Sequence, residues 1–165
     1  MQRLVGLALA PLLVVALSTR APAQTKPAQG SKEEAKAMVE KAAAFYKANG
    51  RDKTLAEITR SASDKSGGFS DRDLYIFAYD FAGLVLAHGS NPKLVGKNLF
   101  DMQDADGRYL IRGLIETARK GSGWYYYKWS NPITKKIDDK MAYVLKLSDD
   151  LWIGCGVYGR LATAK

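Results

Sequence analysis

Residues Gly123 to Trp129 read Gly-Trp-Tyr-Tyr-Tyr-Lys-Trp, so five aromatic side chains and one cation occupy seven positions. Side chains alternate between the two faces of a β-strand, and rings would therefore lie on both faces of the sheet that contains this strand. Rings on both faces indicate that both are at least partly covered. A filled core explains the bulk of these rings. Three neighbouring phenol hydroxyls could also donate hydrogen bonds to a small ligand, because a buried hydroxyl needs a partner.

Two more strands are predicted after this stretch, at Met141–Leu147 and Leu151–Tyr158. Short polar links join them to each other and to the strand Trp124–Trp129, as is typical of antiparallel neighbours. Upstream, Leu74–Tyr79 alternates with a period of two and is followed by the apolar run Leu84–His88. A short loop with a glycine joins these two runs, which predicts a hairpin.

Three helices are predicted from apolar side chains at helical spacing. The first spans Ser31–Asn49, where Ser31 and Glu34 form a capping box. The second spans Lys53–Ser61 and the third spans Arg108–Lys120. Two helices, two strands, one helix and three strands predict an α+β fold, in which helices cover a five-stranded antiparallel sheet.

The N-terminal residues have the layout of a secretory signal peptide. A short basic start precedes the apolar run Leu4–Leu17, and Ala21-Pro22-Ala23 offers small residues at a cleavage site. The run is shorter than the ~20 residues that span a bilayer, which favours cleavage after Ala23 over a membrane anchor. We therefore expect a periplasmic or secreted protein with no stable membrane span after cleavage. The expected parts are a signal peptide (1–23), a flexible leader (24–30), one domain (31–160) and a tail (161–165).

The charge pattern argues against nucleic-acid binding. The net charge is +8, but opposite charges alternate, as in Asp71-Arg72-Asp73, whereas nucleic-acid-binding proteins gather their cations on one face. The sequence has no dinucleotide, phosphate-loop, nucleophile-elbow or metalloprotease motif. The single His88 and the single Cys155 do not make a typical metal site. We therefore expect no cofactor, no metal and no catalytic residue, and we expect Cys155 to be a buried small thiol.

Two glycines interrupt the last predicted strand. Gly154 and Gly156 share a face with Trp152 and Tyr158, while Ile153, Cys155 and Val157 are among the residues of the other face. Glycine weakens a strand interior and is found where another backbone or a ligand approaches closely. Helix packing and ligand contact both remain open as the reason. For His88, a structural role and a polar contact to a ligand remain open in the same way.

Four stretches resemble single Cache domains, in the same order and at similar spacing. They are residues 73–101, 123–136, 140–147 and 151–158, and the resemblance covers roughly 31–158. It implies an extracytoplasmic relative of the PAS fold, with a long N-terminal helix on a curved five-stranded sheet and a pocket on the concave face. Such domains bind small molecules, often short carboxylates, and many are the sensing part of chemoreceptors or kinases.

Carried over to this sequence, the resemblance implies a set of ligand-binding residues. Lys140 and Tyr143 lie on opposite faces of a regular strand, so they can share a pocket only if the strand bends. Tyr125 and Tyr126 stand where the family usually has smaller residues, and they could narrow the pocket. Arg112 is added because its guanidinium could pair with a carboxylate. The full expected set is Tyr79, His88, Arg112, Tyr127, Trp129, Lys140 and Tyr143.

Three functions are compatible with these features. The first is a small-molecule sensing domain without its own signalling module, because the sequence ends seven residues after Tyr158; its partner would be a membrane-bound receptor or kinase. The second is a periplasmic enzyme that uses the same pocket. The third is a protein-binding scaffold whose pocket is filled, with Tyr127 and Trp129 packed without a cavity.

Overall fold

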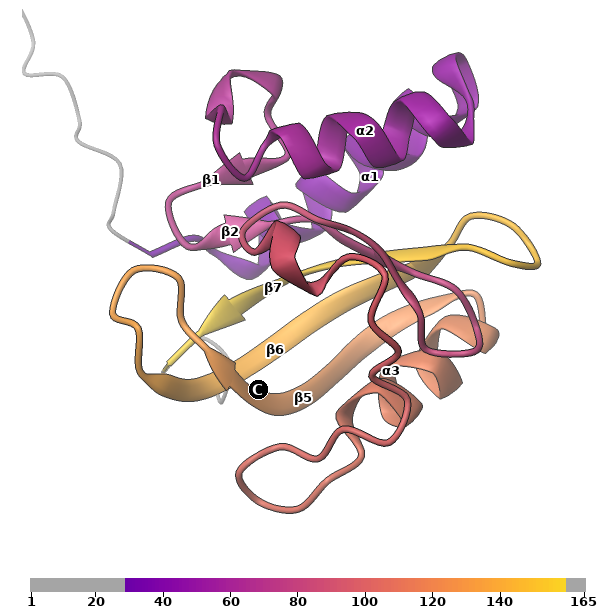
Figure 1. The fold of residues 1–165 in the computed structure, drawn as a ribbon. Helices are drawn as coiled ribbons and strands as arrows, with labels where there is room; N and C mark the ends of the chain where they lie inside the picture. The colour runs from indigo at the N-terminus through magenta and orange to yellow at the C-terminus, as the bar shows by residue number, and fades with distance from the viewer. Residues whose placement is uncertain (1–28, 160–165) are drawn as a thin grey trace, which may run out of the picture.

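The computed structural model describes residues 29–159, so the predicted signal peptide (1–23), most of the leader and the tail (161–165) lie outside the described residues. Helices α1 (Lys32–Asn49) and α2 (Arg51–Arg60) lie on one side of a five-stranded sheet, and α3 (Leu110–Arg119) lies on the other (Figure 1). This arrangement confirms the predicted α+β fold. Within residues 29–159, no helix is both long enough and apolar enough to cross a membrane.

The five-stranded sheet has the order β4-β3-β7-β6-β5, and every pair is antiparallel. The last strand, β7, lies in the middle, between β3 and β6, which explains why all seven of its residues are buried. The edge strand β5 pairs with β6 over nine residue pairs without a register shift. The strands are β3 (Phe77–Tyr79), β4 (Val85–His88), β5 (Ser122–Ser130), β6 (Ile137–Lys146) and β7 (Trp152–Tyr158).

The predicted strand Leu74–Tyr79 is divided between two sheets. Its first part, β2 (Leu74–Tyr75), pairs with β1 (Ser70–Asp71) in a separate two-stranded sheet. The chain changes partners at Ile76, whose N–H donates to the Phe69 carbonyl while its own carbonyl accepts from the Gly89 N–H. The period of two continues through this change, because each half is extended, and the sequence therefore did not reveal it.

The first helix forms as predicted. The Ser31 hydroxyl accepts from the Glu34 N–H at 3.1 Å, and the Glu34 carboxylate accepts from the Ser31 N–H at 2.9 Å, which completes the capping box. Gly50, with φ of +81°, ends α1 and also precedes α2 directly. The second helix therefore begins at Arg51, two residues earlier than predicted, since a glycine adopts this left-handed backbone without strain.

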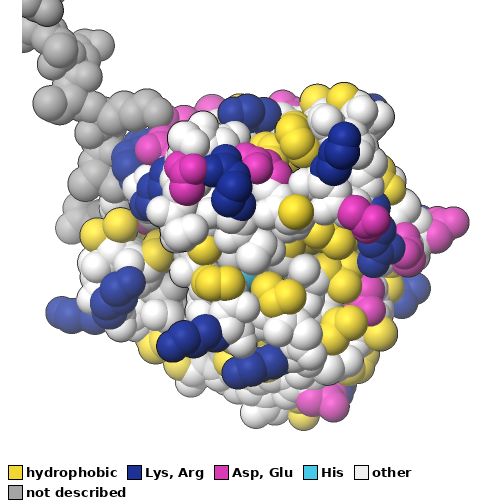
Figure 2. Space-filling model, turned by 45° about the horizontal axis from the view of Figure 1, so that its top comes forward, with side chains coloured by type: hydrophobic (Ala, Val, Ile, Leu, Met, Phe, Trp, Pro, Cys, Tyr) yellow, Lys and Arg dark blue, Asp and Glu magenta, His cyan; other side chains and the backbone are white. Residues whose placement is uncertain are grey.

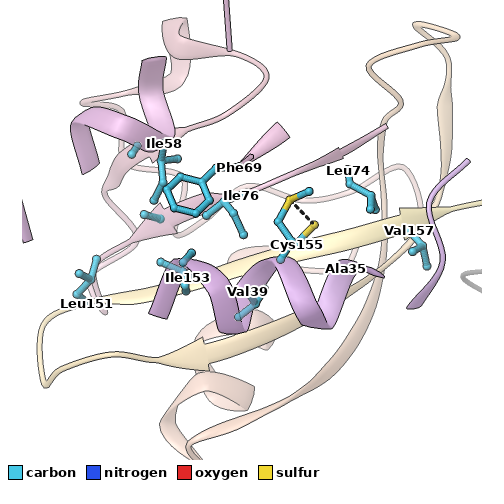
Figure 3. Close-up of a cluster of buried hydrophobic side chains, with 14 residues drawn as sticks. Ala35, Val39, Ile58, Phe69, Leu74, Ile76, Leu151, Ile153, Cys155 and Val157 are labelled. Carbon is cyan, nitrogen blue, oxygen red and sulfur yellow. Dashed lines mark hydrogen bonds between the residues drawn. The ribbon is translucent and has the colours of Figure 1, made fainter. Parts of the chain in front are cut away.

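The core under α1 is apolar throughout (Figure 3). Ile153, Cys155 and Val157 of β7 face Ala35 and Val39 of α1, as the alternation of β7 predicts. Burial raises the pKa of the Cys155 thiol to about 12, so the thiol stays protonated near neutral pH and behaves as a small apolar side chain. The remaining residues of β7 face α3, on the side of the sheet that carries the candidate site.

Candidate ligand-binding site

A cavity lies between the sheet and the N-terminal half of α3. Side chains nearly fill it, because a free volume of only about 10 Å³ remains, roughly enough for a single water molecule. Rings form most of its wall, and Leu110, Ile111 and Leu114 of α3 cover it. The other lining residues are Tyr75, Phe77, Tyr79, His88, Tyr127, Trp129 and Lys140.

Five of the seven residues expected at the site line this cavity, and Arg112 and Tyr143 do not. Tyr143 lies on the face that α1 covers, where its ring centroid is 5.4 Å from that of Trp124. Strand β6 does not bend to bring Tyr143 and Lys140 to the same face, since its pairing with β5 is uninterrupted. Arg112 forms an ion pair with Asp101 outside the cavity. Neither residue is therefore part of the candidate site.

Lys140 is a buried cation that forms no ion pair with the described residues, although the charge of the buried Asp73 carboxylate acts on it from beyond 4 Å. Only 1% of the residue is exposed, and its ammonium nitrogen donates to the Tyr75 hydroxyl at 2.7 Å. Among the described residues, no carboxylate lies within 4 Å of this nitrogen. The nitrogen also lies 4.0 Å from the ring centroid of Tyr75 and 4.8 Å from that of Tyr158. Burial lowers the pKa of Lys140 to about 7, because these contacts replace only part of the lost hydration.

A chain of hydroxyls continues from Lys140. The Tyr75 and Tyr158 hydroxyl oxygens are 2.9 Å apart, and the Tyr158 hydroxyl donates to the Ser130 carbonyl at 3.1 Å. Because the proton of Tyr158 is used at Ser130, Tyr75 is the donor to Tyr158 and the acceptor from Lys140. Tyr75 and Tyr158 were not among the expected site residues. The alternation of side chains could have identified them, because Tyr75 shares a face with Phe77 and Tyr158 shares a face with Trp152.

His88 offers the cavity a second donor. Its Nδ1 atom accepts from the backbone N–H groups of Ser90 at 3.3 Å and Asn91 at 3.0 Å. Nδ1 is therefore unprotonated and the neutral ring carries its proton on Nε2, which has no hydrogen-bond partner among the described residues. Burial, together with the nearby charge of Lys140, lowers the pKa of His88 to about 3, in agreement with a neutral ring.

Two phenols add further donors. The hydroxyls of Tyr79 and Tyr127 have no hydrogen-bond partner among residues 29–159, although both residues are only 3% exposed. Burial raises the pKa of each phenol, so both are protonated near neutral pH. The polar groups of the cavity are thus an amine and N–H or O–H donors, and no Asp or Glu lines it. Such a donor set suits a small acceptor with negative charge.

The glycines of β7 make room for two side chains of this wall. A Cβ atom at Gly156 would lie 2.7 Å from Cε of Lys140, and one at Gly154 would lie 2.6 Å from the Phe77 ring. The atoms that leave no room for a larger residue at these two positions therefore belong to the sheet itself. Gly156 therefore positions Lys140, since any larger residue would displace its aliphatic stem.

The neighbouring tyrosines of β5 do not narrow the cavity. Tyr125 packs onto Gly113 of α3, where a Cβ atom would lie only 2.0 Å from the Tyr125 ring. Tyr126 points to the other face and donates to the carboxylate of Asp139. The expectation that these bulky residues restrict the ligand is therefore not supported by their positions.

The surface around the site has no continuous cationic stripe on the face shown in Figure 2, where Lys and Arg side chains are scattered and several lie beside Asp or Glu. Among the described residues, no group of three His, Cys, Asp or Glu side chains could hold a metal ion.

The family model for single Cache domain 2 matches residues 10–160. The chain belongs to this family. Cache domains are extracytoplasmic sensors that bind ligands. The match begins at residue 10, inside the predicted signal peptide.

Two curated relatives of this Cache domain are signalling proteins. The sensor histidine kinase MctS of Rhizobium johnstonii is 40% identical over 88 residues, which are 53% of this chain and 19% of that protein. The methyl-accepting chemotaxis protein CtpM of Pseudomonas aeruginosa is 32% identical over 111 residues, which are 66% of this chain and 18% of that protein. The chain thus spans about a fifth of the length of these relatives.

Solved structures show the same fold. A methyl-accepting chemotaxis protein from Vibrio parahaemolyticus superimposes with a TM-score of 0.66 and 31% identity, over 77% of this chain and 87% of that chain. A Cache chemosensory domain described as recognising carboxylic acids superimposes with a TM-score of 0.57 and 22% identity, over 76% of this chain and 86% of that chain. These likenesses confirm the Cache fold that the sequence indicated.

Proposed function

We propose that this Cache domain binds a small monocarboxylate beside Lys140. The observation that carries the proposal is the buried Lys140 ammonium, which has one neutral hydrogen-bond partner and no carboxylate within 4 Å among the described residues. A buried charge without a counter-ion is costly, and a bound carboxylate would provide the missing partner. A single cation in the cavity favours one carboxylate group over two. The neighbour that recognises carboxylic acids supports the same ligand class.

The ligand set that we propose is Lys140 for the charge and His88, Tyr79 and Tyr127 for additional hydrogen bonds. Their donors converge on one cavity, and rings exclude water from it, which strengthens each bond. Since about 10 Å³ is too little for acetate, binding must be accompanied by a shift of the wall. We propose binding without chemical turnover, because His88 Nδ1 is occupied by backbone N–H groups and cannot serve as a base.

A protein-binding scaffold is the second candidate, and the small volume of the cavity favours it. A scaffold, however, has no use for a buried cation and would be more stable with an apolar side chain in its place. The sensing domain is therefore expected to bind a small carboxylate, and the scaffold is expected to bind none.

Calorimetry with matched ligand pairs separates these candidates. Protein dialysed free of carboxylate buffers is titrated with acetate, propionate, lactate and pyruvate, and with acetamide and propionamide as uncharged isosteres. We expect at least one carboxylate to bind and its amide to bind at least roughly thirtyfold more weakly, because the amide cannot neutralise Lys140. At 100 times the dissociation constant, the ligand adds about 2.7 kcal/mol to the free energy of unfolding. A panel without binding or thermal shift contradicts the proposal and favours the scaffold.

We also propose that the domain acts in the periplasm or as a secreted protein, after removal of residues 1–23, and that a membrane-bound receptor or kinase responds to its ligand. Sensory relatives that carry this domain in chemoreceptors and histidine kinases support this proposal. In this proposal, residues 31–160 are the binding unit. The mass of the protein recovered from a periplasmic fraction tests the cleavage; a mass that includes residues 1–23 would contradict it.

A further inference from the structure

The side chain of Trp129 lies between the cavity and two pockets at the molecular surface. Its ring lines the cavity and also two surface pockets, one of about 170 Å³ and one of about 460 Å³. Trp129 is the penultimate residue of β5, and the turn of the β5–β6 hairpin begins two residues later. Its position at the end of an edge strand leaves it fewer neighbours than a central residue has.

Trp129 is more exposed than another tryptophan of the same cluster. Trp152 is fully buried, and its indole N–H donates to the Asp80 carbonyl at 2.9 Å. The side chain of Trp129 is only half-buried, and its indole N–H interacts with the hydroxyl of Tyr75, the partner of Lys140. Tyr75 therefore holds the Trp129 ring from the cavity side, while the same ring borders the two surface pockets.

The smaller surface pocket beside Trp129 is apolar. Met102, Leu110 and Ile137 contribute to its wall, and Leu110 also lines the cavity. The opposite side of this pocket is fixed, because the buried carboxylate of Asp104 accepts from the Lys128 N–H of β5 at 3.0 Å and from two N–H groups of its own loop. Trp129 thus forms the boundary between a cationic cavity and an apolar pocket.

We propose that Trp129 sets the maximum length of the carboxylate that this domain accepts. The inference rests on the carboxylate site proposed above. Once the wall has shifted and with the indole in place, the cavity receives a carboxylate and one or two carbons, and a longer chain meets the ring. With the indole removed, the cavity and the apolar pocket become continuous, and an aliphatic chain can extend from Lys140 along Leu110. The occupant of the apolar pocket is then the alkyl tail of a straight-chain monocarboxylate.

The chain length dependence of binding tests this role. Wild-type protein, Trp129→Ala and Trp129→Phe are titrated with acetate, propionate, butanoate, pentanoate and hexanoate. We expect the affinity of the wild type to fall beyond propionate. In Trp129→Ala we expect it to rise by about fourfold for each added methylene up to hexanoate, because each buried methylene contributes about 0.8 kcal/mol. Trp129→Phe is expected between the two, since a smaller ring leaves part of the boundary in place.

Trp124→Ala is the matched control, because Trp124 lies on the same strand but packs on the α1 side of the sheet. It loses a ring of the same size and should keep the wild-type order of ligands. An unchanged order in Trp129→Ala overturns the inference, as does a wild type that already prefers hexanoate. If no carboxylate binds to the wild type or to any variant, the proposed carboxylate site fails, and this inference fails with it. If Trp129→Ala does not fold, the test uses Trp129→Phe, and the inference is overturned if this variant ranks the ligands as the wild type does.

Discussion

Replacing Lys140 with Met is expected to make the ligand-free protein more stable and to abolish carboxylate binding. Methionine keeps the length and flexibility of the aliphatic stem, so it can lie over Gly156 as the lysine does. It removes a buried charge that has no carboxylate within 4 Å among the described residues. We expect the free energy of unfolding to rise by about 2–4 kcal/mol at pH 6, where the lysine is charged in both the folded and the unfolded state.

The same substitution should weaken carboxylate binding by about 2–5 kcal/mol, because the ligand then has no cation to pair with. The hydrogen bond from Tyr75 to Tyr158 remains, so the wall of the cavity keeps its arrangement. Lys146→Met is the matched control on the same strand, since Lys146 is exposed and pairs only with Asp149 at the surface. It should change stability and binding little. A Lys140→Met protein that is less stable than wild type and binds propionate normally would refute the role of Lys140.

The affinity for a carboxylate is expected to fall as the pH rises above 7. Burial lowers the pKa of Lys140 to about 7 in the free protein, so its amine loses the proton between pH 7 and 8. Binding needs the ammonium form, and the apparent affinity should therefore fall by up to about tenfold per pH unit between pH 7 and 9. Below pH 7 the affinity should be constant, because Lys140 is already protonated and a carboxylate ligand remains ionised down to about pH 5.

Other groups at the cavity do not titrate in this window. The pKa of His88 is about 3, and burial raises the pKa values of Tyr75, Tyr79 and Tyr127 above their ordinary value. Calorimetry at pH 8 in buffers with different ionisation enthalpies should show the uptake of up to about one proton for each bound carboxylate. An affinity that stays constant from pH 6 to 9 would contradict this prediction.

The protonation state of Lys140 should also affect the free energy of unfolding, which should rise with pH where the affinity for a carboxylate falls. The folded state binds fewer protons than the unfolded state when a base has a lowered pKa, so the stability of the ligand-free protein should rise between about pH 7 and pH 10. Below pH 7 both states are protonated at Lys140, and its contribution to the pH dependence disappears. Urea unfolding at several pH values measures this slope, and Lys140→Met should reduce it.

Alternation along the strands was the most informative property of the sequence. It correctly predicted the two faces of β7, and it already indicated that Tyr143 could not share a regular face with Lys140. The resemblance to a family suggested both residues, and the uninterrupted pairing of β5 with β6 decided between them. A residue suggested by a family pattern therefore needs to agree with the local period before it is placed in a site.

The rest of the site depends on long-range contacts that a single sequence does not display. Tyr75 reaches Lys140 because the chain changes sheets at Ile76, and the two residues are 65 positions apart. Arg112 has the right chemistry for a carboxylate, but Leu110, Ile111 and Leu114 occupy the buried face of α3. The volume of the cavity depends on the rotamers of several rings, which no sequence pattern specifies.

The titration of the Lys140 amine by nuclear magnetic resonance tests the central claim most directly. With the side chain assigned through Lys140→Met, its resonance is followed from pH 5 to 11 in the free protein and at saturation with propionate. We predict a pKa near 7 in the free protein, and a rise of at least roughly one unit with propionate because a carboxylate stabilises the ammonium form. A Lys140 amine that titrates at the same pH with and without propionate would show that no carboxylate pairs with it.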